Sequence, residues 1–429
     1  MNKKVCVVGL GYIGLPTSLV FAKAGFEVVG VDVSDWVVQS LNAGATHIIE
    51  NGIEEVFEEV RNEYKFKAQT TPESADAFII AVPTPVNEDH TANLDYVVSA
   101  TKSILPYLKA GNVVIVESTI PPRTTDDVVA PILAEAGWQV GSEIYLAHCP
   151  ERVLPGSIFR ELVENNRIVG GYNSISADKA ADLYRTFVKG EIVLTYSTSA
   201  EMAKLMENTY RDVNIALANE LAKASVELGV DALEVIQLAN KHPRVKLHSP
   251  GPGVGGHCIA VDPYFIIEKA PWATPLMATA REINNSMPSF VVEQVEKIAS
   301  PFQELPVAVF GLTYKGNVDD IRESPALAVV NLLRQRGYQV MAHDPHVHPD
   351  HCPIRLYSAQ EALNGAHCLV VLADHNEFAL LDENLLRNMH TPVILDTKNC
   401  LNVSGSSRAT VYNYGNLHKI GLLEPVAAR

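Results

Sequence analysis

Three glycines near the start of the chain have the spacing of a dinucleotide-binding loop. Gly9, Gly11 and Gly14 form a GxGxxG pattern that follows an apolar run and opens a helical one. Such a loop allows a tight turn and brings backbone N–H groups close to a pyrophosphate. Asp32, at the end of the next apolar run, is placed to accept hydrogen bonds from ribose hydroxyls and would repel a 2′-phosphate. The pattern predicts an NAD site; a glycine turn without a ligand is the alternative.

A lysine and an asparagine near the middle of the chain could act on one substrate atom. Lys204 and Asn208 are four residues apart in a helical pattern, so they project from the same face. A solvated helix face is the ordinary explanation for such a pair. The interpretation therefore needs support from another segment.

Cys258 offers that support, because it follows a run of glycines where backbone could approach a ligand closely, with Asp262 four residues further on. A thiolate in such a place could act as a nucleophile. A single cysteine is more often a small buried hydrophobic residue. Three other cysteines, which lie on or beside apolar runs, are interpreted as such core residues: Cys6, Cys368 and Cys400.

A group of histidines occurs in the sequence HDPHVHPDH. Imidazoles can bind metals, but these residues follow an apolar run, where polar loop residues are expected, and they lack a clear ligand spacing. We predict a polar loop and no metal site for these residues: His343, His346, His348 and His351.

Alternating elements would position these groups in the first half of the chain. Apolar runs suited to buried parallel strands alternate there with helical patterns. This alternation predicts a doubly wound parallel sheet. The expected strands cover residues 3–9, 26–33, 77–85, 112–119 and 143–151.

The middle of the chain has a different pattern. Residues 199–229 are rich in Ala, Leu, Glu and Asn and contain no proline or glycine before Gly229. Apolar residues recur among them at helical spacing, which predicts a long central helix. A second helix is expected over residues 273–298. Between them lies SPGPGVGGHC, residues 249–258, whose composition is too unusual for a simple linker.

The last part of the chain repeats the first. VAVFGLTYKG with RGYQVMAHD corresponds to VCVVGLGYIG with AGFEVVGVD, and further strands are expected near HCLVVLAD and TPVILDTKN. The apparent duplication predicts a second nucleotide-binding domain. We therefore expect an α/β protein with two Rossmann-like, doubly wound parallel-sheet domains joined by a central helical region with a long helix. The expected domains are an NAD-binding domain (1–198), a helical dimerisation and catalytic region (199–300) and a C-terminal domain (301–429).

Composition limits the possible partners. The 429 residues are 47% hydrophobic and 20% charged, as in ordinary globular proteins, and the net charge of −16 argues against nucleic-acid or anionic-membrane surfaces. The six cysteines contain no CxxC pair, so neither a disulfide framework nor a zinc site is expected. No apolar stretch approaches the roughly 20 residues that cross a bilayer, and MNKK runs into a strand pattern, so we expect a cytoplasmic protein.

With these features assembled, nearly the whole chain resembles the UDP-glucose/GDP-mannose dehydrogenase family. Seven blocks in order carry the resemblance, which makes it more specific than any single motif. They are GLGYIGLP (9–16), VPTP (82–85), EST (117–119), CPERVLPG (149–156), EMAKLMENTYRDVNIALANE (201–220), GVGGHCIAVDP (253–263) and GLTYKGNVDDIRESPA (311–326).

The resemblance implies two successive NAD-dependent oxidations at the sugar C6, from alcohol through aldehyde to carboxylate. The Cys258 thiolate would add to the aldehyde, and the resulting hemithioacetal would give up the second hydride while the intermediate stays bound. Water would then hydrolyse the thioester. Two NADH would be released for each sugar.

The resemblance also implies roles for single residues. Lys204 and Asn208 would hold and polarise the C6 oxygen, Glu151 would be the general base for water or the thiol, and Asp262 would position and activate water. Thr119 would lie near the nicotinamide or the catalytic water. The implied NAD-binding residues are Gly9, Gly11, Tyr12, Ile13, Gly14, Asp32, Pro83, Thr84, Thr119 and Arg322.

The UDP moiety is implied to lie against the C-terminal domain and the loop at 253–256. Arg244, in NKHPRV, resembles an arginine that enters the neighbouring subunit's substrate site, which implies a homodimer with a shared active site; a surface charge is the alternative. The implied substrate-binding residues are Glu151, Arg152, Lys204, Asn208, Arg211, His242, Arg244, Gly253, Gly255 and Lys315.

One departure from the family pattern bears on the sugar. UDP-glucose members typically carry a lysine immediately before the aspartate that follows the cysteine, whereas this chain has Val261. The resemblance then implies an N-acetylhexosamine, and GVGGHCIAVDP, NKHPRV and RDVNIALANE together imply UDP-N-acetyl-D-mannosamine. UDP-N-acetylglucosamine, or UDP-glucose, is the alternative substrate.

Two other functions remain open. A one-step hydroxyacid dehydrogenase also places a lysine and an asparagine one turn apart after its Rossmann domain, but it needs neither Cys258 nor a second nucleotide domain. An NAD-sensing binding protein without catalysis would be expected to lack Lys204, Cys258 or Asp262, and all three are present. The number of NADH formed per substrate separates these functions.

Overall fold

The computed structural model describes residues 3–154, 156–379, 381, 383–402 and 409–420. They form two compact units: the first contains the chain up to 207 together with 264–271, and the second contains 208–263 and the chain from 272. The predicted three-domain division stays a prediction, and its last part includes 403–408 and 421–429, which lie outside the described residues. Among the described helices, none is both long enough and apolar enough to cross a membrane.

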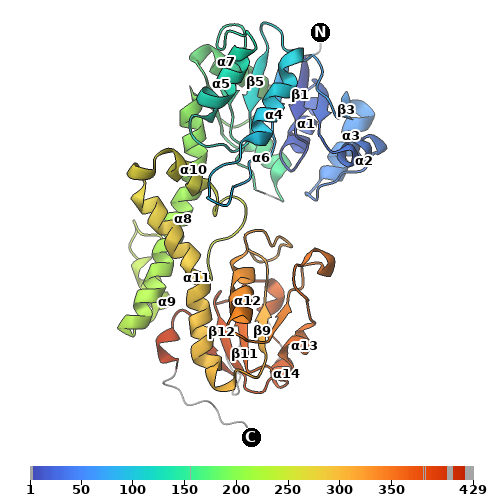
Figure 1. Cartoon of the computed structure of the whole chain (residues 1–429). Coiled ribbons are helices and arrows are strands. Elements are labelled where there is room, and N and C mark those ends of the chain that lie inside the picture. Colours follow the sequence, from blue (N-terminus) through green and yellow to red (C-terminus); the bar gives the residue numbers. More distant parts are fainter. Residues whose placement is uncertain (1–2, 155, 380, 382, 403–408, 421–429) are drawn as a thin grey trace. The chain divides into compact units, whose positions relative to one another are not determined.

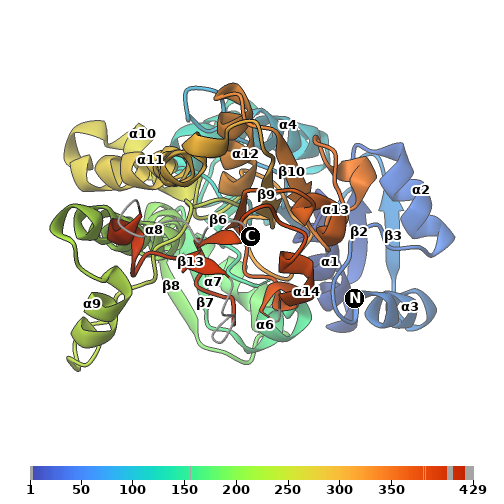
Figure 2. The same ribbon diagram turned by 90° about the horizontal axis from the view of Figure 1, so that it is seen from below.

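The first unit is built on a sheet that has, within the described residues, eight strands in the order β3-β2-β1-β4-β5-β6-β7-β8. The pairs from β3 to β6 are parallel, β6 and β7 are antiparallel, and β7 and β8 are again parallel. Figure 2 shows β2 and β3 at one end of the sheet and β7 and β8 at the other. The strands are β1 (Lys4–Val8), β2 (Glu27–Val31), β3 (Phe66–Gln69), β4 (Ala77–Ile80), β5 (Val113–Val116), β6 (Tyr145–His148), β7 (Arg167–Gly171) and β8 (Ile192–Tyr196).

The central strands form because short apolar runs are buried on both faces. All residues of β4 and β5 are buried, and helices joined to the strands cover the sheet. The five predicted strands are confirmed, with shorter ends; β4 stops at Ile80 because the following VPTP loop contains two prolines. The helices of this unit are α1 (Gly14–Lys23), α2 (Asp35–Ala43), α3 (Ile53–Glu63), α4 (Asp95–Ile104), α5 (Ala130–Glu135), α6 (Ile158–Glu164), α7 (Ser174–Tyr184) and most of α10 (Asp262–Lys269).

The second unit contains a sheet that has, in the part of the chain that the structure describes, five parallel strands in the order β10-β9-β11-β12-β13. Its first turn repeats that of the first unit. The Leu312 N–H donates to Asp344 Oδ2 at 2.7 Å, and the Leu10 N–H donates to Asp32 Oδ2 at 3.0 Å. This agreement supports the predicted duplication. The strands are β9 (Val307–Phe310), β10 (Val340–His343), β11 (Cys368–Val371), β12 (Val393–Asp396) and β13 (Thr410–Tyr412).

Two long helices occupy the middle of the chain. The helices predicted over 199–229 and 273–298 are confirmed as α8 (Ser197–Leu228), which contributes to both units, and α11 (Pro275–Ala299). In the second unit, α11 packs against α12 (Figure 1). The remaining helices are α9 (Ala232–Ala239), α12 (Pro325–Gln335), α13 (Ala359–Leu363) and α14 (Glu383–Leu386).

A buried ion pair joins α8 to α11 in the second unit. Arg281 Nη1 donates to Asp212 Oδ1 at 2.6 Å, and the side chains are 4% and 0% exposed. The Asn284 amide donates to Asp212 Oδ1 at 2.8 Å and to its backbone oxygen at 3.0 Å. Burial raises the pKa of Asp212, and the Arg281 charge opposes this shift. The pairing thus compensates the burial of a carboxylate between the two helices.

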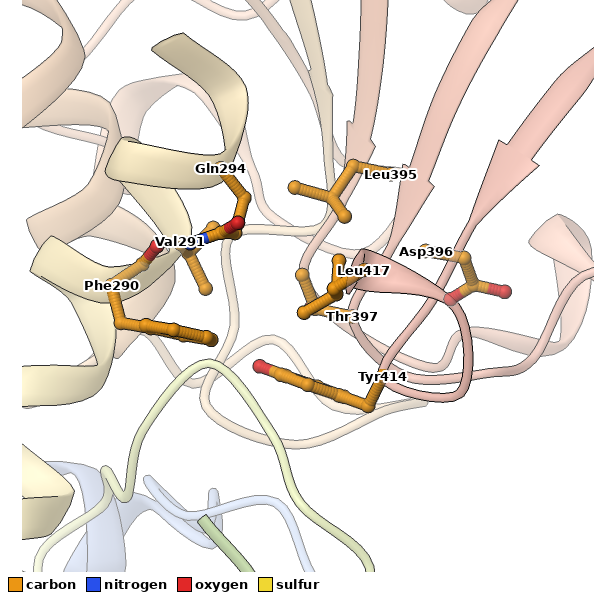
Figure 3. A pocket seen from close by; sticks show the side chains of 8 residues that line it. All are labelled: Phe290, Val291, Gln294, Leu395, Asp396, Thr397, Tyr414 and Leu417. Carbon is orange, nitrogen blue, oxygen red and sulfur yellow. Dashed lines mark hydrogen bonds between the residues drawn. The ribbon is translucent and has the colours of Figure 1, made fainter. Parts of the chain in front are cut away.

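A small cavity of about 10 Å³ lies between α11 and the end of β12. Figure 3 shows Tyr414 pointing into it beside Phe290 and Leu395. The Tyr414 hydroxyl is buried and has no hydrogen-bond partner among the described residues. The cavity has room for about one water molecule, so it is not a nucleotide site.

We predict that Arg281→Leu lowers the free energy of unfolding of the second unit by about 3–5 kcal/mol, because the Asp212 carboxylate is left buried without its cation. Denaturant unfolding measures the change. Arg336→Leu is the matched control: Arg336 is 56% exposed and pairs with Glu296 at 2.9 Å, so its loss is expected to cost less than about 1 kcal/mol. Equal effects of the two substitutions would contradict this account.

Candidate active site

The three loop glycines have different structural tasks in the first unit. Gly9 has φ +94°, and a Cβ there would lie 2.4 Å from the Ala81 carbonyl oxygen. A Cβ on Gly14 would lie 1.8 Å from the Gly9 carbonyl oxygen, whereas one on Gly11 meets nothing within 4 Å. Gly9 and Gly14 therefore permit close packing, and Gly11 borders the open space into which a pyrophosphate could come.

Asp32 faces this loop from the end of β2. Its Oδ2 accepts the Leu10 N–H at 3.0 Å, and its Oδ1 accepts the Ser34 N–H at 2.9 Å. A carboxylate oxygen has more than one acceptor site, so both oxygens can still accept bonds from ribose hydroxyls. The carboxylate is thus fixed in orientation by backbone before any nucleotide binds.

Ser118 joins two further segments of the predicted NAD site. Its hydroxyl donates to the Val82 carbonyl oxygen at 2.7 Å and accepts the Val82 N–H at 2.9 Å, which ties the EST segment to the VPTP loop. The Thr84 hydroxyl in that loop is buried and has no partner among the described residues, and Thr119 is half-buried. A buried unpaired hydroxyl beside an open glycine loop fits a bound nucleotide. The sequence analysis did not single out Ser118.

A buried charge cluster holds Glu151. Arg167 donates from Nη2 to Glu151 and, at 3.5 Å, to Glu117, while its Nε donates to Cys149 Sγ at 3.2 Å. The Tyr184 hydroxyl donates to Glu117 at 2.6 Å. Burial raises the pKa of Glu117, and the Arg167 guanidinium opposes this. Two carboxylates thus share one guanidinium, which fixes the orientation of Glu151.

The sequence analysis missed the partners of Glu151, although it quoted the EST block that contains Glu117. An acidic residue at the end of an otherwise apolar strand was the available signal for Glu117. Nothing local marked Arg167 or Tyr184, because they come from β7 and α7, and β7 was not predicted. Arg152 is held separately, since its Nη1 donates to Glu207 of α8 at 2.7 Å.

The first turns of α8 are fixed to the segment that follows Thr119. Glu201 accepts the Thr125 N–H at 2.8 Å, the Thr125 hydroxyl at 2.6 Å and the Arg123 N–H at 2.6 Å. Burial raises the pKa of Glu201 to about 6. One turn further on, Lys204 and Asn208 lie four residues apart on α8, and both are half-buried. The helical spacing that the sequence predicted for this pair is confirmed.

The structure brings Asn208 and Asp262 together in the second unit. The Asn208 amide donates to Asp262 Oδ2 at 2.6 Å, and Asp262 is only 3% exposed. Asp262 also begins α10, and its N–H donates to the Cys258 carbonyl oxygen at 2.9 Å. Cys258 itself is half-buried. The Cys258 backbone, the Asn208 amide and the Asp262 carboxylate are therefore held together by one short segment and the helix that contacts it.

The glycines before Cys258 let this segment pack onto the C-terminal sheet domain. The Gly256 N–H donates to the Arg322 carbonyl oxygen at 3.1 Å. A Cβ on Gly255 would lie 2.4 Å from the Glu323 carbonyl oxygen, and one on Gly256 would lie 2.9 Å from the Tyr314 ring. Glycine is required here because the two stretches of backbone approach each other too closely to leave room for a Cβ.

Other predicted binding residues are exposed within the second unit, where charged groups can meet a nucleotide. The Arg322 guanidinium is paired with Asp320 at 2.6 Å, and the Arg244 N–H donates to His242 Nδ1 at 3.3 Å. The roles of these residues stay predictions. The exposed residues are Arg211, His242, Arg244, Lys315 and Arg322.

The histidine-rich loop places His346 near His375 and Glu377, with one possible ligand atom of each within 4.8 Å of the others. Nδ1 of His375 accepts the Asn317 N–H at 2.9 Å, so Nε2 carries the proton and donates to Asp344 at 3.1 Å. Both nitrogens of His375 are thereby used, which disfavours a metal.

Of the cysteines predicted as core, Cys6 and Cys368 are buried, and Cys400 is only half-buried.

A Rossmann unit with an open glycine loop, and a second unit that repeats its first turn, define a dinucleotide-dependent dehydrogenase with an additional nucleotide domain. The chain belongs to the UDP-glucose/GDP-mannose dehydrogenase family: its NAD binding domain matches residues 3–188, its central domain 198–286 and its UDP binding domain 308–403. The cofactor is NAD, and the residues around Gly11, Asp32 and Thr84 fit it.

Relatives of known name cover almost the whole chain. UDP-N-acetyl-D-mannosamine dehydrogenase of Methanocaldococcus jannaschii is 49% identical over 94% of this chain and 93% of its own length. An NDP-N-acetyl-D-galactosaminuronic acid dehydrogenase of Ralstonia solanacearum is 44% identical over 92% of this chain and 96% of its own length. The solved structure of a UDP-N-acetyl-mannosamine dehydrogenase from S. aureus is 52% identical, covers 97% of this chain and 100% of its own, and has a TM-score of 0.90.

We predict that Gly11→Ala weakens NAD binding about tenfold or more while the protein stays folded, because the new methyl group enters open space beside the nucleotide. Gly14→Ala is expected instead to destabilise the first unit by about 1–3 kcal/mol, because its Cβ would overlap the Gly9 carbonyl oxygen. Calorimetric titration with NAD and thermal unfolding separate the two effects. Unchanged NAD affinity in Gly11→Ala would contradict the proposed approach of the pyrophosphate.

Proposed function

We propose that this protein oxidises the C6 hydroxyl of UDP-N-acetyl-D-mannosamine to the carboxylate in two NAD-dependent steps, and that Cys258 holds the sugar between them. The observation that carries the proposal is the fixed Cys258 turn, whose carbonyl oxygen accepts the Asp262 N–H at 2.9 Å while Asn208 of α8 binds the Asp262 carboxylate at 2.6 Å. A one-step alcohol oxidation has no use for a thiol placed in this way. Similarity to relatives named for this substrate supports the choice of sugar.

In the first step, the residues of this chain bind and polarise the C6 oxygen. The Lys204 ammonium and the Asn208 amide stabilise the negative charge that develops on this oxygen as its proton leaves through water held by Asp262. Bound NAD supplies a hydride acceptor in each oxidation. The glycine loop and Asp32 orient the nucleotide, and Thr119 lies towards its reacting end.

In the second step, the thiol of Cys258 adds to the aldehyde carbon. A C–S bond forms, the thiol proton is lost to a base, and the C6 oxygen becomes the hydroxyl of a hemithioacetal. Loss of a hydride and of the hydroxyl proton leaves a thioester. Water deprotonated by Glu151 then attacks the thioester carbon, the C–S bond breaks, and the carboxylate leaves with Cys258 regenerated.

The charge cluster around Glu151 suits this base. Arg167 bridges Glu151 and Glu117, which fixes the carboxylate without enclosing it completely, since the Glu151 side chain retains 9% exposure. A base that was not held in this way would spend less time in the correct orientation. Proton transfer requires the two heavy atoms to lie within about 3 Å of each other.

The choice of sugar rests on Val261 together with the named relatives. The galactosaminuronic relative is nearly as similar as the mannosamine relative, so identity alone does not select the sugar. Val261, in the position where UDP-glucose members typically carry a lysine, supports an N-acetylhexosamine.

We also propose a cytoplasmic homodimer in which Arg244 of each subunit enters the substrate site of the other, with the UDP moiety near Gly253, Gly255 and Lys315.

We predict that the intact enzyme forms two NADH per UDP-N-acetyl-D-mannosamine, because the covalent intermediate cannot leave between the oxidations. Cys258→Ala is expected to abolish carboxylate formation, and any residual turnover should stop at one NADH and the aldehyde. Absorbance of NADH with limiting sugar gives the count. Cys352→Ala, which alters another half-buried cysteine, is the matched control and should retain two.

A panel of UDP-N-acetyl-D-mannosamine, UDP-N-acetylglucosamine and UDP-glucose in the same assay tests the sugar. Activity with UDP-glucose alone would contradict the assignment of the sugar. One NADH from the intact enzyme, or two from Cys258→Ala, would contradict the covalent mechanism.

A further inference from the structure

Helix α8 is attached to both ends of the segment that carries Cys258. At the far end of the segment, the Asn208 amide donates to Asp262 Oδ2 at 2.6 Å. At the near end, the Gly251 N–H donates to Asn219 Oδ1 at 2.9 Å. Both attachments lie within the second unit and come from one helix. The helix therefore fixes the distance between the two ends of the segment.

Asn219 is itself immobilised by the buried ion pair that joins α8 to α11. Its amide nitrogen donates to Asn284 Oδ1 at 2.8 Å, and the Asn284 amide in turn donates to Asp212 Oδ1 at 2.8 Å. Asn219 is completely buried and Asn284 is 1% exposed. Each end of the Asn219 amide is thus used once, so the side chain cannot flip without losing two bonds.

The segment between these attachments depends on outside support for its shape. It contains four glycines from Gly251 to Cys258, and two of them, Gly253 and Gly256, have positive φ of +136° and +81°. Glycines have the largest conformational freedom of any residue, so such a segment has many accessible shapes when its ends are released. Between its two ends, the Gly256 N–H donates to the Arg322 carbonyl oxygen at 3.1 Å, and the Val261 and Asp262 N–H groups donate to the Cys258 carbonyl oxygen at 3.1 and 2.9 Å.

We propose that Asn219 is a positioning residue for Cys258: its amide connects the buried Asp212–Arg281–Asn284 group to Gly251 and so holds the thiol where the aldehyde forms. Asn219 touches neither substrate nor cofactor in this proposal. It acts through Gly251 and the glycine segment, whereas Asn208, which binds Asp262 at the other end, also contacts the C6 oxygen in the proposed first step.

The proposal rests on the proposed covalent role of Cys258, and it makes a prediction that a purely structural role would not. The first oxidation needs Lys204 and Asn208, which lie on α8 itself and do not depend on Gly251. The second needs the thiol in place. Loss of the Asn219 bond should therefore affect the second oxidation selectively, and misplacement by ~1 Å reduces such a step about 100-fold.

Two variants and a control test this. Asn219→Leu removes both bonds at similar volume, and Asn219→Asp keeps an acceptor for the Gly251 N–H but loses the donor to Asn284. Asn214→Leu is the control, because Asn214 lies on the same helix and its amide donates within that helix, to the Tyr210 carbonyl oxygen at 2.7 Å. Circular dichroism and thermal unfolding establish which variants are folded.

Two readouts are measured on the full-length protein. The first is NADH per UDP-sugar, together with aldehyde trapped by semicarbazide. The second is the rate at which iodoacetamide alkylates Cys258, located by peptide mass, which needs no sugar and so remains informative if the proposed activity is wrong. In Asn219→Leu, NADH per sugar should fall from two towards one, trapped aldehyde should appear, and the alkylation rate of Cys258 should change; Asn219→Asp should lie between this variant and the wild type.

The outcomes separate the two proposals. Two NADH and an unchanged Cys258 alkylation rate in folded Asn219→Leu would overturn the positioning role. Failure of both Asn219 variants to fold while Asn214→Leu folds would assign Asn219 to folding and would also overturn it. Absence of NADH formation by the wild type would instead overturn the proposed function, with the alkylation comparison still deciding the role of Asn219.

Discussion

The pairing of the buried Asp212 carboxylate with Arg281 is the interaction on which the Cys258 segment of the second unit depends. A carboxylate inside a helix pair is stable only when a cation and further donors compensate its burial, and Arg281 and Asn284 both donate to its Oδ1 from α11. The need for these partners fixes the register of α8 against α11. That register places Asn219 opposite Gly251 and Asn208 opposite Asp262. Both ends of the Cys258 segment are thus attached to α8, whose register against α11 depends on a charge outside that segment.

The same turn serves two purposes in the two units. In the first, the Asp32 carboxylate binds the backbone of the glycine loop and keeps acceptor sites that a ribose can use. In the second, Asp344 occupies the equivalent place, but Nε2 of His375 donates to it at 3.1 Å and both groups are completely enclosed. The repeated aspartate therefore became an internal structural group. This difference explains how one duplicated fold can provide an NAD domain and a second nucleotide domain that need not bind a dinucleotide.

Sequence reasoning reached the elements whose signals are local. The glycine loop, the five central strands, α8 and α11 follow from periodicity and from residues that only a turn requires, and the structure has them within a few residues of the predicted bounds. It missed β3, β7 and β8. β3 (FKAQ) has two apolar residues in four and β7 (RIVGG) ends in two glycines, whereas β8 (IVLTY) is a short apolar run that was not recognised. It also missed Ser118, Glu117, Arg167 and Asn219, whose importance comes from partners 16 to 67 residues away in the chain. Such partnerships leave no periodic pattern.

The central claim is that Cys258 carries the sugar between the two oxidations, and rapid acid quenching during the first turnover tests it most directly. Wild-type enzyme is mixed with NAD and UDP-N-acetyl-D-mannosamine, quenched at successive times and digested, and the peptide that contains Cys258 is weighed by mass spectrometry. The account predicts an acyl adduct of the sugar nucleotide on Cys258 that rises with the second NADH and then decays. A second NADH that forms while this peptide stays unmodified at every time would contradict it.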